Sequence, residues 1–153
     1  MTKILFVCHG NICRSPIAEF IMKDKIKKLK LEKQFFIDSC GVSNEEAGNK
    51  IYPKAFNTLV KHNILNAAHI ARQMTKSDYE NFDFIFMMDK SNIRNFNRLF
   101  GSDYKNKISL ITEYLDGIED IEDPWYTDNF ELIFNQIEVA IENILKKKFG
   151  IGE

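Results

Sequence analysis

Two kinds of apolar pattern alternate along the chain. Short, continuous apolar runs at residues 3–7, 34–40, 83–88 and 108–111 predict strands that are buried on both faces. Longer segments with apolar residues every three or four positions predict helices over residues 16–31, 53–62, 91–100 and 129–149. Because strands alternate with helices, the pattern predicts an α/β fold with a parallel sheet covered by helices on both faces.

In such folds, ligands bind beyond the carboxyl ends of the strands. Cys8 follows the first predicted strand and Asp89 follows the third, so both are expected at that edge of the sheet.

The chain is expected to fold as one domain, residues 1–153. It shows no repeat, low-complexity tract or linker, and its length is sufficient for one complete core. An apolar share of 44% with thirteen Phe predicts burial rather than disorder.

A net charge of −1 argues against nucleic acid or a membrane surface as partner, and lysine clusters at residues 25–30 and 146–148 are expected on solvated helix faces.

The cysteines and the start of the chain bear on the compartment. Three cysteines are an odd number and two lie in one loop, so they do not form a disulfide framework. The first residues lead directly into a short strand-like run rather than a signal peptide, and no stretch reaches transmembrane length. A reducing, cytoplasmic setting is expected, with secretion by another route as the open alternative.

The most informative chemistry lies between the first strand and the first helix. Cys8 and Arg14 bracket five residues, so a tight loop can present a sulfur and a guanidinium to one tetrahedral anion. Ser15-Pro16 then predicts the start of a helix. This order directs backbone N–H groups and the positive end of the helix dipole into the loop. It favours a bound phosphate, or another oxyanion, and an ionised cysteine.

These residues can carry out phosphoryl transfer. The thiolate of Cys8 is the candidate nucleophile, and the loop amides with a bidentate Arg14 can hold the phosphoryl oxygens. The product would be a phosphocysteine, which water must then hydrolyse. Ser15 can donate its hydroxyl to the departing sulfur, and Asn11 can bond the loop backbone and hold a strained conformation.

The ester oxygen must leave protonated, so an acid is needed as well. The best candidate is Asp123, because the proline that follows it disfavours helix at the aspartate and fixes a loop. Trp125 and Tyr126 would then line the wall of the site and suit a flat aromatic leaving group.

Each feature also has a plainer interpretation. A Cys-x5-Arg spacing often arises by chance, and an Asp-Pro pair is most often a turn. His69 fits a hydrogen-bonded structural residue better than a base or a ligand. No metal-ligand spacing occurs among the His and Cys residues, so no metal is expected. The functional interpretation therefore depends on the conjunction of features.

That conjunction resembles the low-molecular-weight protein tyrosine phosphatases over essentially the whole chain. Residues 8–19 match the amino-terminal signature of the family almost throughout. Later landmarks match as well, namely Asp38-Ser39 with Gly41, residues 69–73, residues 88–92, and Asp123-Pro124-Trp125-Tyr126. The order also fits, because this family has its nucleophile near the start and its acid far downstream.

The resemblance implies a four-stranded parallel sheet flanked by helices, with no metal or organic cofactor. It assigns Cys8 as the nucleophile, Arg14 as the phosphate clamp, and Asp123 as the acid and then the base. The implied substrate is a tyrosine-phosphorylated protein, and a monomer is expected. Phosphate binding and support of the loop fall to a larger set: His9, Gly10, Asn11, Ile12, Cys13, Ser15, Ser39 and His69. Within this set, the resemblance implies that Asn11, Ser15, Ser39 and His69 form the hydrogen-bond network that supports the loop.

Cys13 matches a second loop cysteine of the family. In the family, that cysteine can form a reversible disulfide with the nucleophile under oxidation, so the resemblance implies that Cys13 would protect Cys8 from over-oxidation.

The chain departs from the family pattern in two places. Many members carry an aromatic wall residue where this chain has Glu45, so one side of the pocket is expected to be open and acidic. Such a side would repel substrates with acidic flanks. The usual Asp-Pro-Arg is here Tyr52-Pro53-Lys54, which we interpret as a structural variation.

Three other functions stay open on sequence grounds. Arsenate reductases of this architecture relay electrons through two further cysteines, whereas the only later cysteine here is Cys40. Protein-arginine phosphatases favour Thr where this chain has Ile12. The apolar side chain of Ile12 therefore favours phosphotyrosine over phosphoarginine as the substrate. A silent phosphotyrosine-binding module needs neither a nucleophile nor an acid. We therefore predict hydrolysis of phosphotyrosine in proteins, and of small aryl phosphates, through a phosphocysteine.

Overall fold

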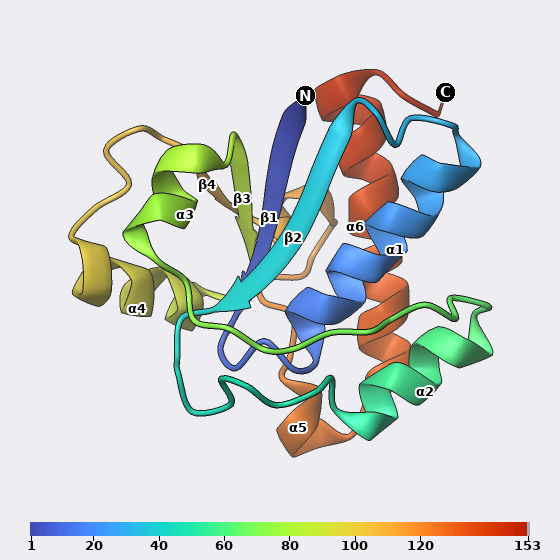
Figure 1. The fold of residues 1–153 in the computed structure, drawn as a ribbon, viewed down its shortest axis with the longest axis horizontal. Coiled ribbons are helices and arrows are strands. Elements are labelled where there is room, and N and C mark those ends of the chain that lie inside the picture. The colour runs from blue at the N-terminus through green and yellow to red at the C-terminus, as the bar shows by residue number, and fades with distance from the viewer. Residues whose placement is uncertain (153) are drawn as a thin grey trace.

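The computed structural model describes residues 1–152 and has a sheet of four parallel strands at its centre. The strands are β1 (Thr2–Cys8), β2 (Phe35–Gly41), β3 (Phe84–Met87) and β4 (Ile108–Leu110). Their order in the sheet is β2-β1-β3-β4, so β1 has a neighbour on each side (Figure 1). The predicted α/β fold with a four-stranded parallel sheet is confirmed.

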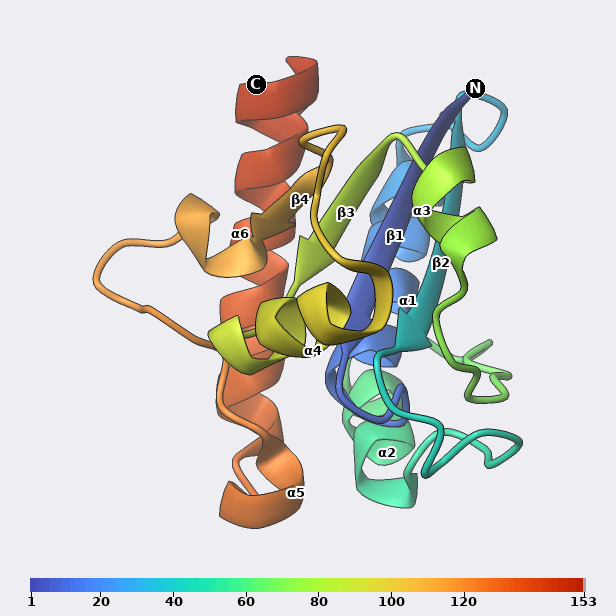
Figure 2. The same ribbon diagram turned by 90° about the vertical axis from the view of Figure 1, so that its left-hand side faces the viewer.

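Helices cover both faces of the sheet (Figure 2). Helices α1 (Arg14–Lys28), α2 (Pro53–Lys61) and α6 (Phe130–Phe149) contribute to one core, and α3 (Lys76–Asn81) and α4 (Lys90–Phe100) to the other. Side chains of β1 alternate between the two, with Ile4 and Phe6 in the first core and Leu5 and Val7 in the second. A strand buried on both faces explains the continuous apolar run.

All predicted strands and helices are present, with ends displaced by at most three residues. Three short elements are absent from the prediction: α3, the 3-10 helix η1 (Ile111–Tyr114) and α5 (Pro124–Thr127). Helix α1 begins at Arg14, earlier than predicted, because the carbonyl of Cys13 already accepts the N–H of Ile17 at 3.1 Å. Pro16 still lies in the first turn, where a missing N–H costs nothing.

The loop after β1 and helix α5 lie at the carboxyl edge of the sheet, and the N-terminus lies at the opposite end (Figure 1). At this edge β2 approaches the loop closely. A Cβ atom on Gly41 would lie 2.6 Å from the carbonyl oxygen of His9, so only glycine permits the approach. No helix among residues 1–152 is long and apolar enough to cross a membrane.

Candidate active site

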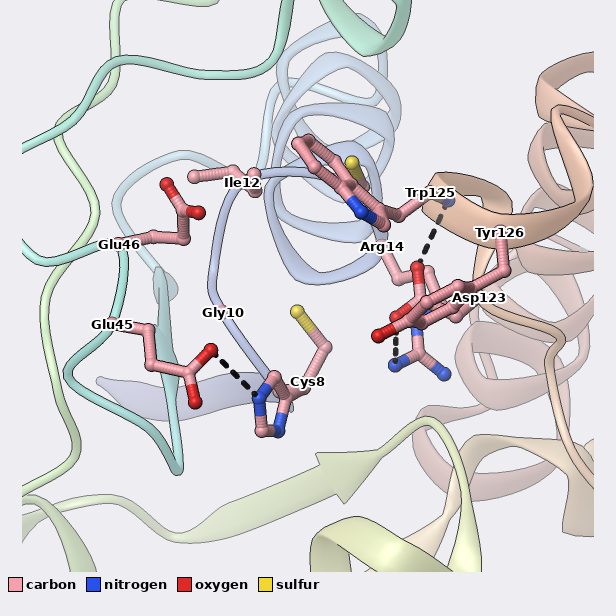
Figure 3. A pocket seen from close by; sticks show the side chains of 11 residues that line it. Cys8, Gly10, Ile12, Arg14, Glu45, Glu46, Asp123, Trp125 and Tyr126 are labelled. Atoms are coloured by element: carbon pink, nitrogen blue, oxygen red, sulfur yellow. Dashed lines mark hydrogen bonds and ion pairs between the residues drawn. The ribbon is translucent and has the colours of Figure 1, made fainter.

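A cavity of about 90 Å³ opens at this edge, and the loop between β1 and α1 forms part of its wall (Figure 3). The structure brings together in it the predicted nucleophile Cys8, the predicted clamp Arg14 and the predicted acid Asp123. The remaining lining residues come from the loop, from an acidic side and from an aromatic side: His9, Gly10, Ile12, Cys13, Glu45, Glu46, Trp125 and Tyr126.

Cys8 is the last residue of β1 and is almost fully buried. Its Sγ lies 3.0 Å from Oγ of Ser15, and the N–H of Asn11 donates to it at 3.3 Å. Helix α1 starts beside this sulfur without a side-chain cap at Cys13. The N–H groups of its first turn therefore have no capping side chain, an arrangement that suits a bound anion.

Arg14, the first residue of α1, is held in one orientation by two acceptors. Its Nη1 donates to Oδ2 of Asp89 at 2.6 Å and to the carbonyl oxygen of Ile121 at 2.8 Å. Its Nη2 lies 3.6 Å from Oδ2 of Asp123. Burial lowers the pKa of Arg14, but the charges of Cys8, Asp89 and Asp123 raise it by more, so the guanidinium stays charged.

Asp89 has no assigned role in the sequence-based prediction. It caps α4, since its Oδ1 accepts the N–H of Asn92 at 2.8 Å while its other oxygen binds Arg14. Its place directly after a buried strand and within the family landmark at residues 88–92 indicated a position near the site, but did not identify the partner.

Asp123 is the N-cap of α5. Its Oδ1 accepts the N–H of Trp125 at 3.1 Å, while Oδ2 faces Arg14. Its backbone is extended (φ −84°, ψ 110°), as predicted for a residue before proline, and Pro124 then begins a short helix where the prediction has only a loop. The cap fixes the carboxylate so that one oxygen remains available to the cavity.

Asn11 connects the loop to the rest of the fold. It adopts the left-handed conformation (φ 61°) and is fully buried. Its Nδ2 donates to Oγ of Ser15 at 2.9 Å and to Oγ of Ser39 at 3.0 Å. Its Oδ1 accepts the N–H of Arg72 at 3.0 Å, and its carbonyl oxygen lies 2.8 Å from Nε2 of His69. Asn11, Ser15, Ser39 and His69 thus lie in one hydrogen-bond network.

Glu19 extends this network and is missing from the predicted site. It is almost fully buried, and its Oε1 accepts from Oγ of Ser39 at 2.6 Å and lies 3.9 Å from Nδ1 of His69. Lys23 pairs with its other oxygen at 2.5 Å. A carboxylate among the apolar residues of a buried helix is costly unless it is paired, so its presence there was a usable sequence indication.

The other two cysteines lie in less favourable surroundings for a thiolate. Burial, followed by the charges of Cys8 and Asp123, raises the pKa of Cys13 well above its usual value. Burial likewise raises the pKa of Cys40. Both thiols therefore stay protonated at neutral pH. Among residues 1–152, no group of three or more His, Cys, Asp or Glu side chains is placed to hold a metal ion.

The mouth of the cavity has two unlike sides. Trp125 and Tyr126 form one side and are 52% and 84% exposed. Glu45 and Glu46 lie on the opposite side of the loop (Figure 3). Glu45 lies 3.7 Å from Nε2 of His9 and is largely exposed. A phosphate ester entering the cavity therefore passes between aromatic rings and carboxylates.

The fold is a parallel α/β sheet with an anion-binding loop after its first strand, and comparison with known proteins identifies the class. Residues 3–149 match the family "Low molecular weight phosphotyrosine protein phosphatase". A protein of that name from Schizosaccharomyces pombe is 42% identical, over 95% of this chain and 98% of its own.

Solved structures agree. The crystal structure of YfkJ from Bacillus subtilis has a TM-score of 0.90 at 31% identity and covers 100% of this chain and 98% of that one. A structure of the YwlE arginine phosphatase has a TM-score of 0.84 at 25% identity, covering 98% of this chain and 97% of that one. The chain belongs to the low molecular weight phosphotyrosine protein phosphatase family, and it is a hydrolase of the protein-tyrosine phosphatase class. The predicted family is confirmed.

Proposed function

We propose that this chain hydrolyses phosphotyrosine in proteins through a covalent phosphocysteine, with Cys8 as nucleophile, Arg14 as phosphate clamp and Asp123 as acid and then base. The observation that carries this proposal is the meeting of the three side chains in one cavity at a helix N-terminus. They come from β1, α1 and the start of α5, which are far apart in sequence.

In the first step, the Cys8 thiolate attacks phosphorus and forms an S–P bond while the P–O bond to the tyrosine breaks. Arg14 and the amides of the loop hold the phosphoryl oxygens, whose geometry the guanidinium fork matches. Asp123 gives its proton to the departing phenolate oxygen, so the product leaves as a neutral phenol. Trp125 and Tyr126 supply apolar surface for the aromatic ring.

In the second step, the Asp123 carboxylate takes a proton from water, which attacks phosphorus as the S–P bond breaks. Inorganic phosphate and the thiolate of Cys8 are the products. Oγ of Ser15 accepts from Asn11, so its own hydrogen can point to the carbonyl oxygen of Cys40 at 3.3 Å or to the sulfur at 3.0 Å, and a thiolate is the nearer acceptor and carries the charge. That hydrogen bond stabilises the thiolate as a leaving group.

The test measures kcat/KM on matched phosphotyrosine, phosphoarginine and phosphoserine peptides without added metal. We expect phosphotyrosine to be preferred, Cys8→Ser to abolish turnover, and Asp123→Asn to reduce it by about 10²- to 10⁴-fold, the usual contribution of a general acid. Equilibrium binding of phosphate by Cys8→Ser shows whether the loop remains formed in that variant.

Three outcomes would count against the proposal. A preference for phosphoarginine would assign this chain the substrate of its YwlE neighbour and overturn the interpretation of Ile12. Turnover that persists in Cys8→Ser would exclude the phosphocysteine. Wild-type-like turnover of Asp123→Asn on phosphotyrosine peptides would remove Asp123 as the acid.

We further propose that the chain acts as a monomer in a reducing compartment such as the cytoplasm. The support is that one chain supplies every residue that lines the cavity, and that Cys8, Cys13 and Cys40 are all unpaired. Sedimentation at working concentration tests the monomer.

If peroxide inactivation is reversed by thiol in the wild type but not in Cys13→Ser, Cys13 protects the nucleophile through a reversible disulfide.

A further inference from the structure

Two side chains at the start of α2 reach across to α5, the short helix that follows Asp123. The ring of Tyr52, the N-cap of α2, lies 4.9 Å from the ring of Trp125. Nζ of Lys54 donates to Oδ1 of Asp128 at 2.6 Å. In Figure 1, α2 and α5 lie side by side at the edge of the molecule that carries the loop between β1 and α1, residues 9–13, which we call the phosphate loop.

We propose that Tyr52 and Lys54 form a latch that holds α5, and with it the carboxylate of Asp123, over the phosphate loop. Tyr52 and Lys54 are positioning residues: neither lines the cavity. The inference rests on the proposed role of Asp123 as general acid.

Tyr52 connects both halves of the site. Its backbone N–H donates to the carbonyl oxygen of Ile12, in the phosphate loop, at 2.9 Å. Its ring packs on Trp125 and stacks on Phe130, the first residue of α6, at 6.0 Å. Because one residue touches the loop through its backbone and the acid segment through its ring, it fixes the distance between Cys8 and Asp123.

Helix α5 needs such support from outside. It contains only four residues, Pro124–Thr127, and a single helical turn is unstable by itself in water. Trp125 and Tyr126 are both exposed, so α5 has little burial of its own besides Pro124. Asp128, in the left-handed conformation (φ 63°), ends the helix and is the residue that Lys54 holds.

The two contacts differ in strength. The Lys54–Asp128 ion pair is exposed and is therefore screened by salt. Salt does not screen the contact between the rings of Tyr52 and Trp125. We therefore expect the ring of Tyr52 to dominate and Lys54 to make a smaller, salt-sensitive contribution.

The first measurement distinguishes a displaced acid from a loss of activity that affects every substrate equally. We compare kcat/KM of wild type, Tyr52→Ala and Tyr52→Phe on phenyl phosphate, whose leaving group needs a proton, and on 4-nitrophenyl phosphate, whose leaving group needs it much less. A displaced Asp123 should lower kcat/KM for phenyl phosphate by about 10- to 100-fold, and for the nitrophenyl ester by less. Tyr52→Phe keeps the ring and should restore wild-type values.

The second measurement does not use activity. Trp125 is the only tryptophan of the chain, so intrinsic fluorescence reports on α5 directly. Acrylamide should quench Trp125 more strongly in Tyr52→Ala than in wild type and Tyr52→Phe. Lys54→Met should increase the quenching of Trp125 by less than Tyr52→Ala does, and added salt should produce the same small increase in the wild type. Lys61→Met removes an exposed lysine of the same helix and should leave the quenching unchanged.

Equal losses on both esters with unchanged quenching in a folded Tyr52→Ala variant would overturn the latch. Failure of the proposed function is a different result: if Asp123→Asn proves fully active on phenyl phosphate, Asp123 is not the acid. The quenching comparison would still show whether Tyr52 holds α5.

Discussion

At the scale of single residues, Asn11 shows why the loop sequence is so restricted. The position needs a left-handed backbone, which glycine adopts most readily, and also a side-chain amide whose oxygen and nitrogen reach three groups. Asn tolerates this conformation better than most residues and supplies the amide. One side chain therefore satisfies a backbone requirement and a hydrogen-bonding requirement together.

Substitution of Asn11 separates these two requirements. Asn11→Gly keeps the backbone conformation and loses the side-chain hydrogen bonds, whereas Asn11→Ala loses both. We expect both variants to lose most of their kcat, and Asn11→Ala to have a free energy of unfolding about 1 kcal/mol lower than Asn11→Gly. Urea denaturation of the three proteins checks this. Equal stability of the two variants would show that the left-handed conformation is not strained for alanine.

Glu45 is the residue whose effect on substrate choice is easiest to isolate. It lines the mouth of the cavity, is exposed, and has Glu46 beside it, so peptides with basic flanks should react faster than peptides with acidic flanks. Glu45→Gln should reduce the ratio of kcat/KM for basic-flanked over acidic-flanked peptides by about two- to five-fold, the range of an exposed charge pair. Added salt should reduce the same ratio in the wild type. Matched phosphotyrosine peptides give the ratio. Equal turnover of both flanks by the wild type would exclude the effect.

At the scale of elements, apolar periodicity was sufficient for the long helices and the strands, because each buries a continuous face. It was insufficient for α3 and α5, which have six and four residues and are too short to show a helical repeat of apolar positions. Spacing in the first loop and the Asp-Pro pair pointed to Cys8, Arg14 and Asp123. The sequence marks Asp89 and Glu19 by their unusual positions, but that they bind Arg14 and Ser39 depends on how α4 and α1 pack, which no local pattern contains.

The cap of α3 is also connected to the phosphate loop. Asp78 accepts the N–H of Thr75 at 2.7 Å and pairs with Arg72 at 2.8 Å, while the backbone N–H of Arg72 binds Asn11. Burial raises the pKa of Asp78, but the hydrogen bonds from Arg72 and Thr75 lower it by more.

This shift predicts a pH dependence of stability. Because the pKa of Asp78 is lower in the folded than in the unfolded chain, the unfolded chain binds more protons in the range between the two values. The contribution of Asp78 is therefore fully present above the unfolded pKa of about 4 and is lost as the pH falls through the lower pKa of the folded chain. Asp78→Asn should lower the free energy of unfolding by about 1–3 kcal/mol near neutral pH, and the difference should shrink with acid. A difference that stays constant from pH 7 to pH 3 would contradict the ion pair.

At the scale of the whole molecule, folding creates the anion site, because Cys8, Arg14 and Asp123 come together only when the sheet has formed. A ligand that binds the folded chain and not the unfolded one must stabilise the fold by mass action. Inorganic phosphate, the product of the proposed reaction, is therefore a probe of the site that requires no turnover.

Phosphate at a hundred times its Kd should add about 2.7 kcal/mol to the free energy of unfolding. For a chain of this length, that corresponds to a rise in Tm of roughly 5–10 °C over sodium chloride of equal ionic strength. Cys8→Ser should keep most of the rise, since the loop and Arg14 remain. Arg14→Lys should lose most of it, because an ammonium cannot reproduce the fork of the guanidinium or its fixed contacts with Asp89 and Ile121. The same rise in wild type and Arg14→Lys would place the bound phosphate outside this cavity, since no anion held by Arg14 could be indifferent to that change.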